Sequence, residues 1–198
     1  KEEDIEINLE NIKNKFIIYI TIAFTLFSIQ ISIPSINTKK TFPGCIKSFK
    51  GYPIKLLTIH LSGGSSMIKS ALVSSKSINA KCIGVSILTS LNEKESKEVY
   101  NQEIPKTVTS MFNLANETDI DGVVCSSHEL KLARDLLQDK IKITPGIRLS
   151  DSNYDDQSRV MNPKEAIDLG ATYLVIGRPI TSHKDKASAF EKIYQSIY

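Results

Sequence analysis

The stretch KIKITPGIRLSDSNYDDQSRVMNPKEAIDLGATYLVIGRPIT, residues 140–181, decides the fold class. It begins with the strand-like run KIKIT (140–144) and ends with a second one, YLVIG (173–177). Between them, residues 163–169 start with a proline, which is typical of a first helical turn. A strand, a helix and a second strand form a parallel unit, so the stretch predicts an α/β sheet with helices outside it.

The same alternation continues toward the N-terminus. Further strands are predicted over 55–61, 82–88 and 121–126, with one more near 28–33, and helices over 63–78, 105–118, 127–137 and 184–198. Serines near the start of the 63–78 segment are able to cap that helix.

Two architectures fit five parallel strands after Lys39 and one before it. A (β/α)8 TIM-type barrel typically takes about 250 residues, so we expect one that is incomplete at its N-terminal side by about two units. A doubly wound open sheet is the alternative, but it would need a glycine-rich loop after its first strand. No such loop occurs there, so the barrel is the preferred prediction.

Composition excludes several classes of protein. The 198 residues are 41% hydrophobic and 24% charged, which excludes an intrinsically disordered chain. A net charge of +3 argues against nucleic acid or an anionic membrane as the principal partner. The three cysteines, Cys45, Cys82 and Cys125, form no C-x-x-C pair, so we expect neither a disulfide framework nor a thiolate zinc site. A reducing cytoplasm is the simpler expectation.

The N-terminal segment is atypical. Residue 1 is Lys, so we expect the numbering to begin inside a longer gene product, and residues 16–38 contain no charged side chain. The strictly apolar part is about a dozen residues, short of the ~20 that a spanning helix needs, and the acidic start does not suit a signal peptide. A buried strand and helix are preferred over a membrane-associated, altered or spanning segment. We therefore divide the chain into residues 1–38 and a barrel domain, 39–198.

Two loops carry the candidate chemistry: TPGIR (144–148) and GRPIT (177–181), each at the end of a predicted strand. In a barrel, the loops after the last two strands are neighbours and commonly bind phosphate. Gly177 would let backbone N–H groups approach an oxyanion, and the Arg178 guanidinium would bind it with two hydrogen bonds. The alternative is that Gly146 and Gly177 are turn glycines and Arg178 is an ordinary surface residue.

Other polar side chains are less specific. Gln157 lies in the polar stretch 149–162, which is longer than the usual connection of about 2–6 residues and so suggests a binding loop or lid. It suits contact with both a phosphate and a base, although a solvated loop residue is the commoner case. We expect His60 to be a hydrogen-bonded core histidine, whereas His128 and His183 show no partner at a suitable spacing.

Taken together, the motifs LLTIHLSGGSSMI, VSILTS and DGVVCSSHEL and the series TPGIR…DDQ…IGRPIT resemble bacterial orotidine 5′-phosphate decarboxylases. The resemblance covers about residues 51–198 and implies a barrel enzyme that converts orotidylate to uridylate and CO2 in pyrimidine synthesis. It implies a cytoplasmic protein that forms a homodimer and uses neither a metal nor an organic cofactor. The implied phosphate-binding residues are Gln157, Gly177 and Arg178 with Arg148 nearby, and Thr89, with Ser90 beside it, is implied to contact the pyrimidine.

The resemblance does not extend to the family's charged array, D-x-K-x-x-D-I-P-N-T. If the Ile-Pro pair is aligned, the three charged positions fall on Phe27, Ile29 and Ser32. If Asn-Thr is aligned instead, they fall on Ile29, Ile31 and Pro34. Neither alignment supplies a lysine or a carboxylate, so no catalytic residue is identified.

Two main hypotheses stay open from the sequence. The chain is a member of the decarboxylase family, or it is a catalytically impaired homologue that binds a nucleotide phosphate and could pair with an intact subunit. A phosphosugar decarboxylase on the same barrel is a third, which DDQSRVMNP favours less.

Overall fold

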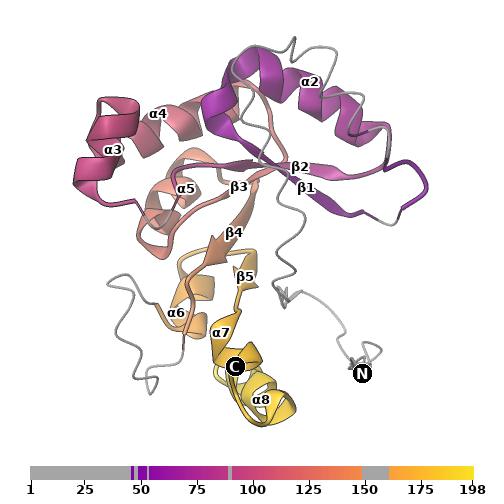
Figure 1. The fold of residues 1–198 in the computed structure, drawn as a ribbon, viewed down its shortest axis with the longest axis vertical. Helices are drawn as coiled ribbons and strands as arrows, with labels where there is room; N and C mark the ends of the chain where they lie inside the picture. Colours follow the sequence, from indigo (N-terminus) through magenta and orange to yellow (C-terminus); the bar gives the residue numbers. More distant parts are fainter. Residues whose placement is uncertain (1–45, 47–48, 53, 89–90, 149–160) are drawn as a thin grey trace.

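The fold is known from a computed structural model that describes residues 46, 49–52, 54–88, 91–148 and 161–198. Its centre is a five-stranded parallel sheet (Figure 1). The strands are β1 (Leu56–His60), β2 (Lys81–Val85), β3 (Gly122–Val124), β4 (Ile141–Pro145) and β5 (Tyr173–Val175). Each matches a predicted strand, and the predicted α/β class is confirmed. The strand predicted near 28–33 lies outside the described residues.

Helices follow the strands in the expected alternation. They are α2 (Gly64–Lys76), α3 (Glu93–Tyr100), α4 (Ile104–Glu117), α5 (Leu130–Leu136), α6 (Pro163–Asp168), α7 (Arg178–Thr181) and α8 (Lys186–Gln195), with short 3-10 turns η2 (Leu61–Gly63) and η3 (Ser127–Glu129). Two sequence predictions need correction. Helix α3 was not expected, and Gly63, rather than a serine, precedes α2 without a side-chain cap.

Strand order separates the two candidate architectures. The order is β1-β2-β3-β4-β5, so each strand pairs with the next one in the chain. A doubly wound sheet contains a point where the order reverses, and the described strands contain none. Sequential parallel strands with a helix after each are the arrangement of a (β/α)8 barrel wall.

The sheet has two different faces. Ile59, Cys82, Val123 and Leu174 alternate onto one face and belong to the main hydrophobic core, together with helix residues such as Phe112. The opposite face is less uniformly buried: His60, Val85, Val124 and Tyr173 are partly exposed, whereas Ile83 and Ile143 are buried. The first face therefore packs against the helices, and the second is the face that a barrel turns inward.

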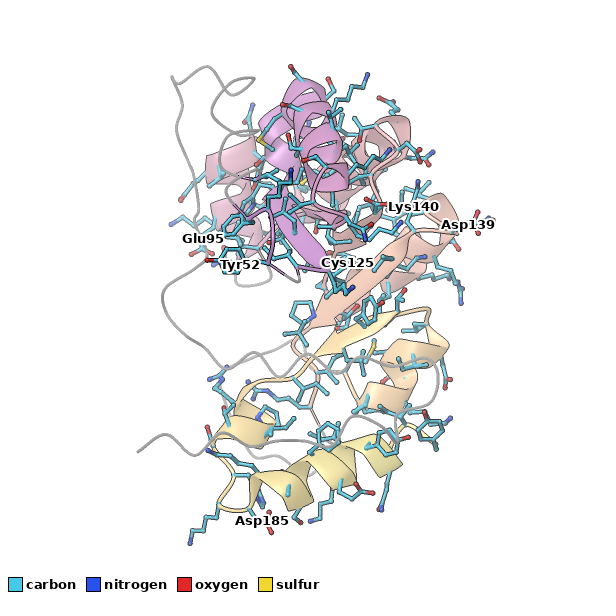
Figure 2. The ribbon with its side chains drawn as sticks, turned by 90° about the vertical axis from the view of Figure 1, so that its right-hand side faces the viewer. Tyr52, Glu95, Cys125, Asp139, Lys140 and Asp185 are labelled. Atoms are coloured by element: carbon cyan, nitrogen blue, oxygen red, sulfur yellow. The ribbon has the colours of Figure 1, made fainter. Side chains whose placement is uncertain are left out.

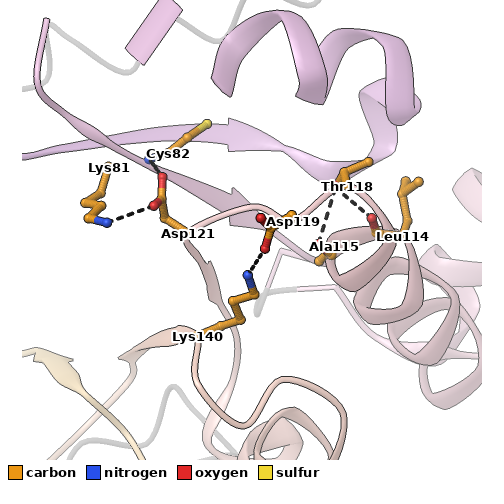
Figure 3. A network of polar contacts seen from close by, with 8 residues as sticks. All are labelled: Lys81, Cys82, Leu114, Ala115, Thr118, Asp119, Asp121 and Lys140. Carbon is orange, nitrogen blue, oxygen red and sulfur yellow. Dashed lines mark hydrogen bonds and ion pairs between the residues drawn. The ribbon is translucent and has the colours of Figure 1, made fainter. Parts of the chain in front are cut away.

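Ion pairs join the amino-terminal ends of neighbouring strands (Figure 3). The Asp121 carboxylate accepts a hydrogen bond from the Cys82 backbone N–H at 2.9 Å and pairs with Lys81 Nζ at 3.0 Å. Next to it, Asp119 pairs with Lys140. The side chains of Lys140 and its neighbour Asp139 project from the same margin of the molecule (Figure 2). The charged side chains of these two ion pairs therefore hold the amino-terminal ends of the strands together.

Across the part of the chain that the structure describes, none of the helices combines the length and the apolar character needed to cross a bilayer.

Candidate functional site

The two predicted phosphate loops leave adjacent strands at the same edge of the sheet. β4 and β5 pair in parallel, with Thr144 opposite Leu174 and Pro145 opposite Val175. Arg148 and Arg178 therefore each stand three residues beyond the same registered pair. Parallel pairing brings the two loops to the carboxyl edge, where α/β barrels carry their active sites.

The loop after β4 turns at Gly146, whose φ of 78° favours glycine. Ile147 then forms a parallel bridge with Met161, and the Arg148 backbone N–H donates to the Met161 carbonyl at 3.1 Å. Arg148 itself is 5% exposed. Residues 149–160, which include the predicted phosphate contact Gln157, lie outside the described residues. The residues on either side of them, Arg148 and Met161, meet at this edge of the sheet.

The loop after β5 leads directly into α7. Gly177 precedes the helix, Arg178 is its first residue, and the buried Ile180 anchors the short turn to the core. A Cβ atom added at Gly177 would meet no atom within 4 Å, so open space lies over this backbone. The Arg178 side chain is exposed. A backbone open to solvent beside an arginine can accept an anionic group.

A third polar group joins the carboxyl ends of β2 and β3. Oε2 of Glu129, in η3, accepts a hydrogen bond from the Ser126 backbone N–H at 2.9 Å and lies 3.5 Å from Ser86 Oγ. Ser86 is fully buried, and its hydroxyl also donates to the Val124 carbonyl at 3.1 Å. The sequence analysis missed this group, although S-S-H-E at 126–129 has the spacing of a capping box.

The remaining predicted positions are placed only in part. Thr89 and Ser90 lie outside the described residues, as do Phe27, Ile29 and Ser32. His60 is partly exposed at the end of β1, so the expectation of a core histidine is wrong. No described residue hydrogen-bonds its ring. Its ring belongs to the partly buried face, because the preceding Ile59 points into the helix-covered core.

Burial controls the titration of several groups near the sheet. It raises the pKa of the Cys125 thiol to about 12, with a smaller contribution from the Glu129 charge, and raises the pKa of Cys82 to about 12, helped by Asp121. Both thiols are free. Burial also lowers the pKa of Lys142, whose ammonium donates to the Gln138 and Lys140 carbonyls at 3.0 Å each. Both thiols are therefore protonated near neutral pH.

A groove of about 480 Å³ lies elsewhere, between α4 and the η3–α5 segment. It is lined by Glu93, Ile104, Pro105, Val108, His128, Glu129 and Leu132. Another groove borders α6. Neither is lined by Arg148, Gly177 or Arg178.

Comparison with known proteins adds a family to this geometry. Residues 41–193 match the model of the orotidine 5′-phosphate decarboxylase / HUMPS family. The chain is 36% identical, over 177 residues, to an orotidine 5′-phosphate decarboxylase of Lawsonia intracellularis, covering 86% of this chain and 77% of that protein. It is 40% identical, over 154 residues, to one of Wolbachia pipientis, covering 77% of this chain and 68% of that protein.

The fold agrees with these sequence matches. The crystal structure of orotidine 5′-phosphate decarboxylase from Lactobacillus acidophilus superposes with a TM-score of 0.65 at 28% identity, covering 81% of this chain and 69% of that one. The predicted barrel class is thereby confirmed, with five of its strands in the described residues. A family model matched over more than half the chain, relatives above 30% identity and this superposition agree: the chain belongs to the orotidine 5′-phosphate decarboxylase / HUMPS family.

Proposed function

We propose that this protein binds orotidine 5′-phosphate and converts it to uridine 5′-phosphate and CO2, the reaction of pyrimidine synthesis named by its relatives. The observation that carries the proposal is the registered pairing of β4 and β5. This pairing brings the TPGIR and GRPIT loops to one edge, with open space over Gly177.

The nucleotide's phosphate is proposed to bind at Gly177 and Arg178, with Arg148 and Gln157 nearby. A dianionic phosphate suits this edge because a guanidinium offers paired donors and a backbone without a Cβ permits close approach. The backbone N–H of the buried Arg148 donates to the Met161 carbonyl, so the backbone that carries the guanidinium is held in place. Thr89 is proposed to contact the pyrimidine from the segment after β2.

The chemical step breaks the bond between C6 of the pyrimidine and its carboxylate and delivers a proton to C6. The carbanion that forms needs preorganised positive charge, and removing one such donor can lower a rate by about 10²–10³-fold. Residues 16–38, where the resemblance would align a lysine and two aspartates, are free of charge. This observation favours a second candidate, a homologue that binds the nucleotide and turns it over weakly or not at all.

The same proposal covers compartment and assembly. Two free, buried thiols, Cys82 and Cys125, suit a reducing cytoplasm, and we propose that the protein resides there. A homodimer is proposed from the family resemblance alone. The boundary between residues 1–38 and the barrel domain 39–198 also remains a prediction.

Calorimetry with 6-azauridine monophosphate, together with a decarboxylation assay on orotidylate, tests the proposal. Binding with turnover supports the decarboxylase, and binding without turnover supports the inactive homologue. If the folded protein binds no nucleotide, both candidates are refuted.

A further inference from the structure

We propose that the groove between α4 and the η3–α5 segment is a binding site for a small organic cation, a guanidinium or amidinium carried on an apolar body. The groove measures about 480 Å³. This volume lies within the ~300–1,000 Å³ that is typical of small-molecule pockets. The cation site does not depend on the proposed function, because Arg148, Gly177 and Arg178 do not line the groove.

The floor of the groove is apolar and belongs to the packed core. Ile104 and Val108 come from successive turns of α4 and are 6% and 1% exposed. Pro105 on the same helix and Leu132 on α5 complete the apolar lining. Helix α4 contacts both α3 and α5, and the three helices are neighbours in Figure 1. The apolar body of a ligand would therefore meet a surface that core packing holds in place.

Two carboxylates line the same groove from different elements. Oε2 of Glu93, the first residue of α3, accepts a hydrogen bond from the Ile104 backbone N–H at 3.1 Å. Oε2 of Glu129, in η3, accepts one from the Ser126 backbone N–H at 2.9 Å. Within the residues that the structure describes, no hydrogen bond or ion pair involves the Oε1 atom of either carboxylate. Each carboxylate is therefore oriented by the fold and keeps one oxygen for a ligand.

The charges that line the groove favour a cation. Among its described lining residues, Glu93 and Glu129 are acidic, His128 carries an imidazole, and none is a lysine or an arginine. A guanidinium or amidinium is flat and presents paired N–H donors that match the geometry of a carboxylate. A metal ion fits less well, because the described residues contain no group of three or more His, Cys, Asp or Glu side chains that could hold one.

The test is an NMR titration of the isotope-labelled full chain with benzamidine and with benzamide, its neutral analogue of similar shape. We expect benzamidine to bind about five- to twentyfold more tightly than benzamide, as for two partly exposed charge pairs. The backbone amide signals of Ile104 and Ser126 should shift during the titration, because their N–H groups bind the two carboxylates. Equal affinity for the two ligands, or no binding of benzamidine at millimolar concentration, would refute the cation site.

Substitutions test whether the two carboxylates cause the charge preference. Glu93→Gln and Glu129→Gln each keep a side-chain oxygen for the backbone N–H and should each weaken benzamidine binding by about two- to fivefold. The double variant should bind benzamidine and benzamide within about twofold of each other. Glu117→Gln, at an exposed glutamate of α4 that does not line the groove, should change neither affinity.

A preference for benzamidine that survives the double substitution refutes the cation site. If the Glu129 variant does not fold, Glu93→Gln alone decides the question, because Glu93 is exposed.

Two further ligands define what the groove accepts. Saturating uridine 5′-phosphate should leave the benzamidine affinity unchanged. Displacement of benzamidine by the nucleotide would overturn the cation site and leave the proposed function intact, whereas binding of benzamidine without any nucleotide binding would do the reverse. If acetyl-leucyl-arginyl-leucine amide binds more tightly than benzamidine, the groove receives an arginine side chain of a protein segment, and the assignment to a small free cation is wrong.

Discussion

The two edges of the sheet use charge in different ways. At the amino-terminal edge, Asp121 pairs with Lys81 and Asp119 pairs with Lys140. At the carboxyl edge, backbone geometry presents Arg148 and Arg178 three residues beyond a registered strand pair, beside an open glycine. The first edge stabilises the fold through its ion pairs, and the second is the edge at which we propose that the ligand binds, the division of roles that barrel enzymes use.

The largest expected effect concerns the two buried thiols, one near each edge. A pKa of about 12, against an ordinary 9.0, leaves each thiol about a thousandfold less ionised at pH 8. We expect Cys82 and Cys125 to be labelled by iodoacetamide at least that much more slowly in the native protein than after unfolding, by peptide mass spectrometry. Fast native labelling of Cys125 alone would show that the carboxyl edge opens while the amino-terminal edge stays closed.

The next effect belongs to the carboxyl edge. Arg178→Ala should weaken nucleotide binding by about 2–4 kcal/mol, or roughly 30- to 700-fold, by removing one side of a charged contact. Because the side chain is exposed, the thermal midpoint should change only slightly. Calorimetry and thermal unfolding measure the two quantities. An unaltered dissociation constant would remove Arg178 from the site.

The matching substitution at the amino-terminal edge should lower the stability of the fold and leave nucleotide affinity unchanged. Asp121→Ala removes the acceptor of the buried Cys82 N–H and should lower the free energy of unfolding by about 1–3 kcal/mol. Asp121→Asn keeps an acceptor and should cost less. Urea unfolding gives the stability, and nucleotide affinity should not move. A loss of affinity without a loss of stability would show that this edge also serves the ligand.

The smallest effect is at Asp119. Lys140 holds the pKa of this carboxyl below its ordinary 3.8, so the ionised form stabilises the fold. That contribution is present above the ordinary value and disappears as the pH falls through the lowered one. Asp119→Asn tolerates the same left-handed backbone, φ 56°, and should lower the urea midpoint slightly at pH 7. If the urea midpoints of the wild-type and Asp119→Asn proteins differ by the same amount at pH 7 and at pH 2, the ion pair does not stabilise the fold.

Much of the fold could be predicted because local pattern and tertiary structure agree. Short strand-like runs such as 140–144 and helical spacing in 105–118 describe elements buried on a definite face. Helix α3 escaped prediction because EKESKEVY is almost entirely polar, and its start is fixed by the Asn92–Glu95 cap rather than by an apolar stripe.

Less of the candidate site than of the fold could be predicted from the sequence. Gly177 and Arg178 stood out as a motif, and strand pairing supplied the reason why the motif matters. His60 was expected in the core, but strand parity turns it to the other face, which a lone residue type cannot reveal. Within the Glu129 group, the contact with Ser126 follows the local spacing of a capping box, but the contact with Ser86 spans 43 positions, which no local pattern contains.

A crystal structure of the protein with uridine 5′-phosphate tests the central claim most directly. The account predicts the phosphate within hydrogen-bonding distance of the Gly177 backbone and the Arg178 guanidinium, at the loops after β4 and β5. A nucleotide bound instead in the groove between α4 and the η3–α5 segment, with Arg178 remote from its phosphate, would contradict it.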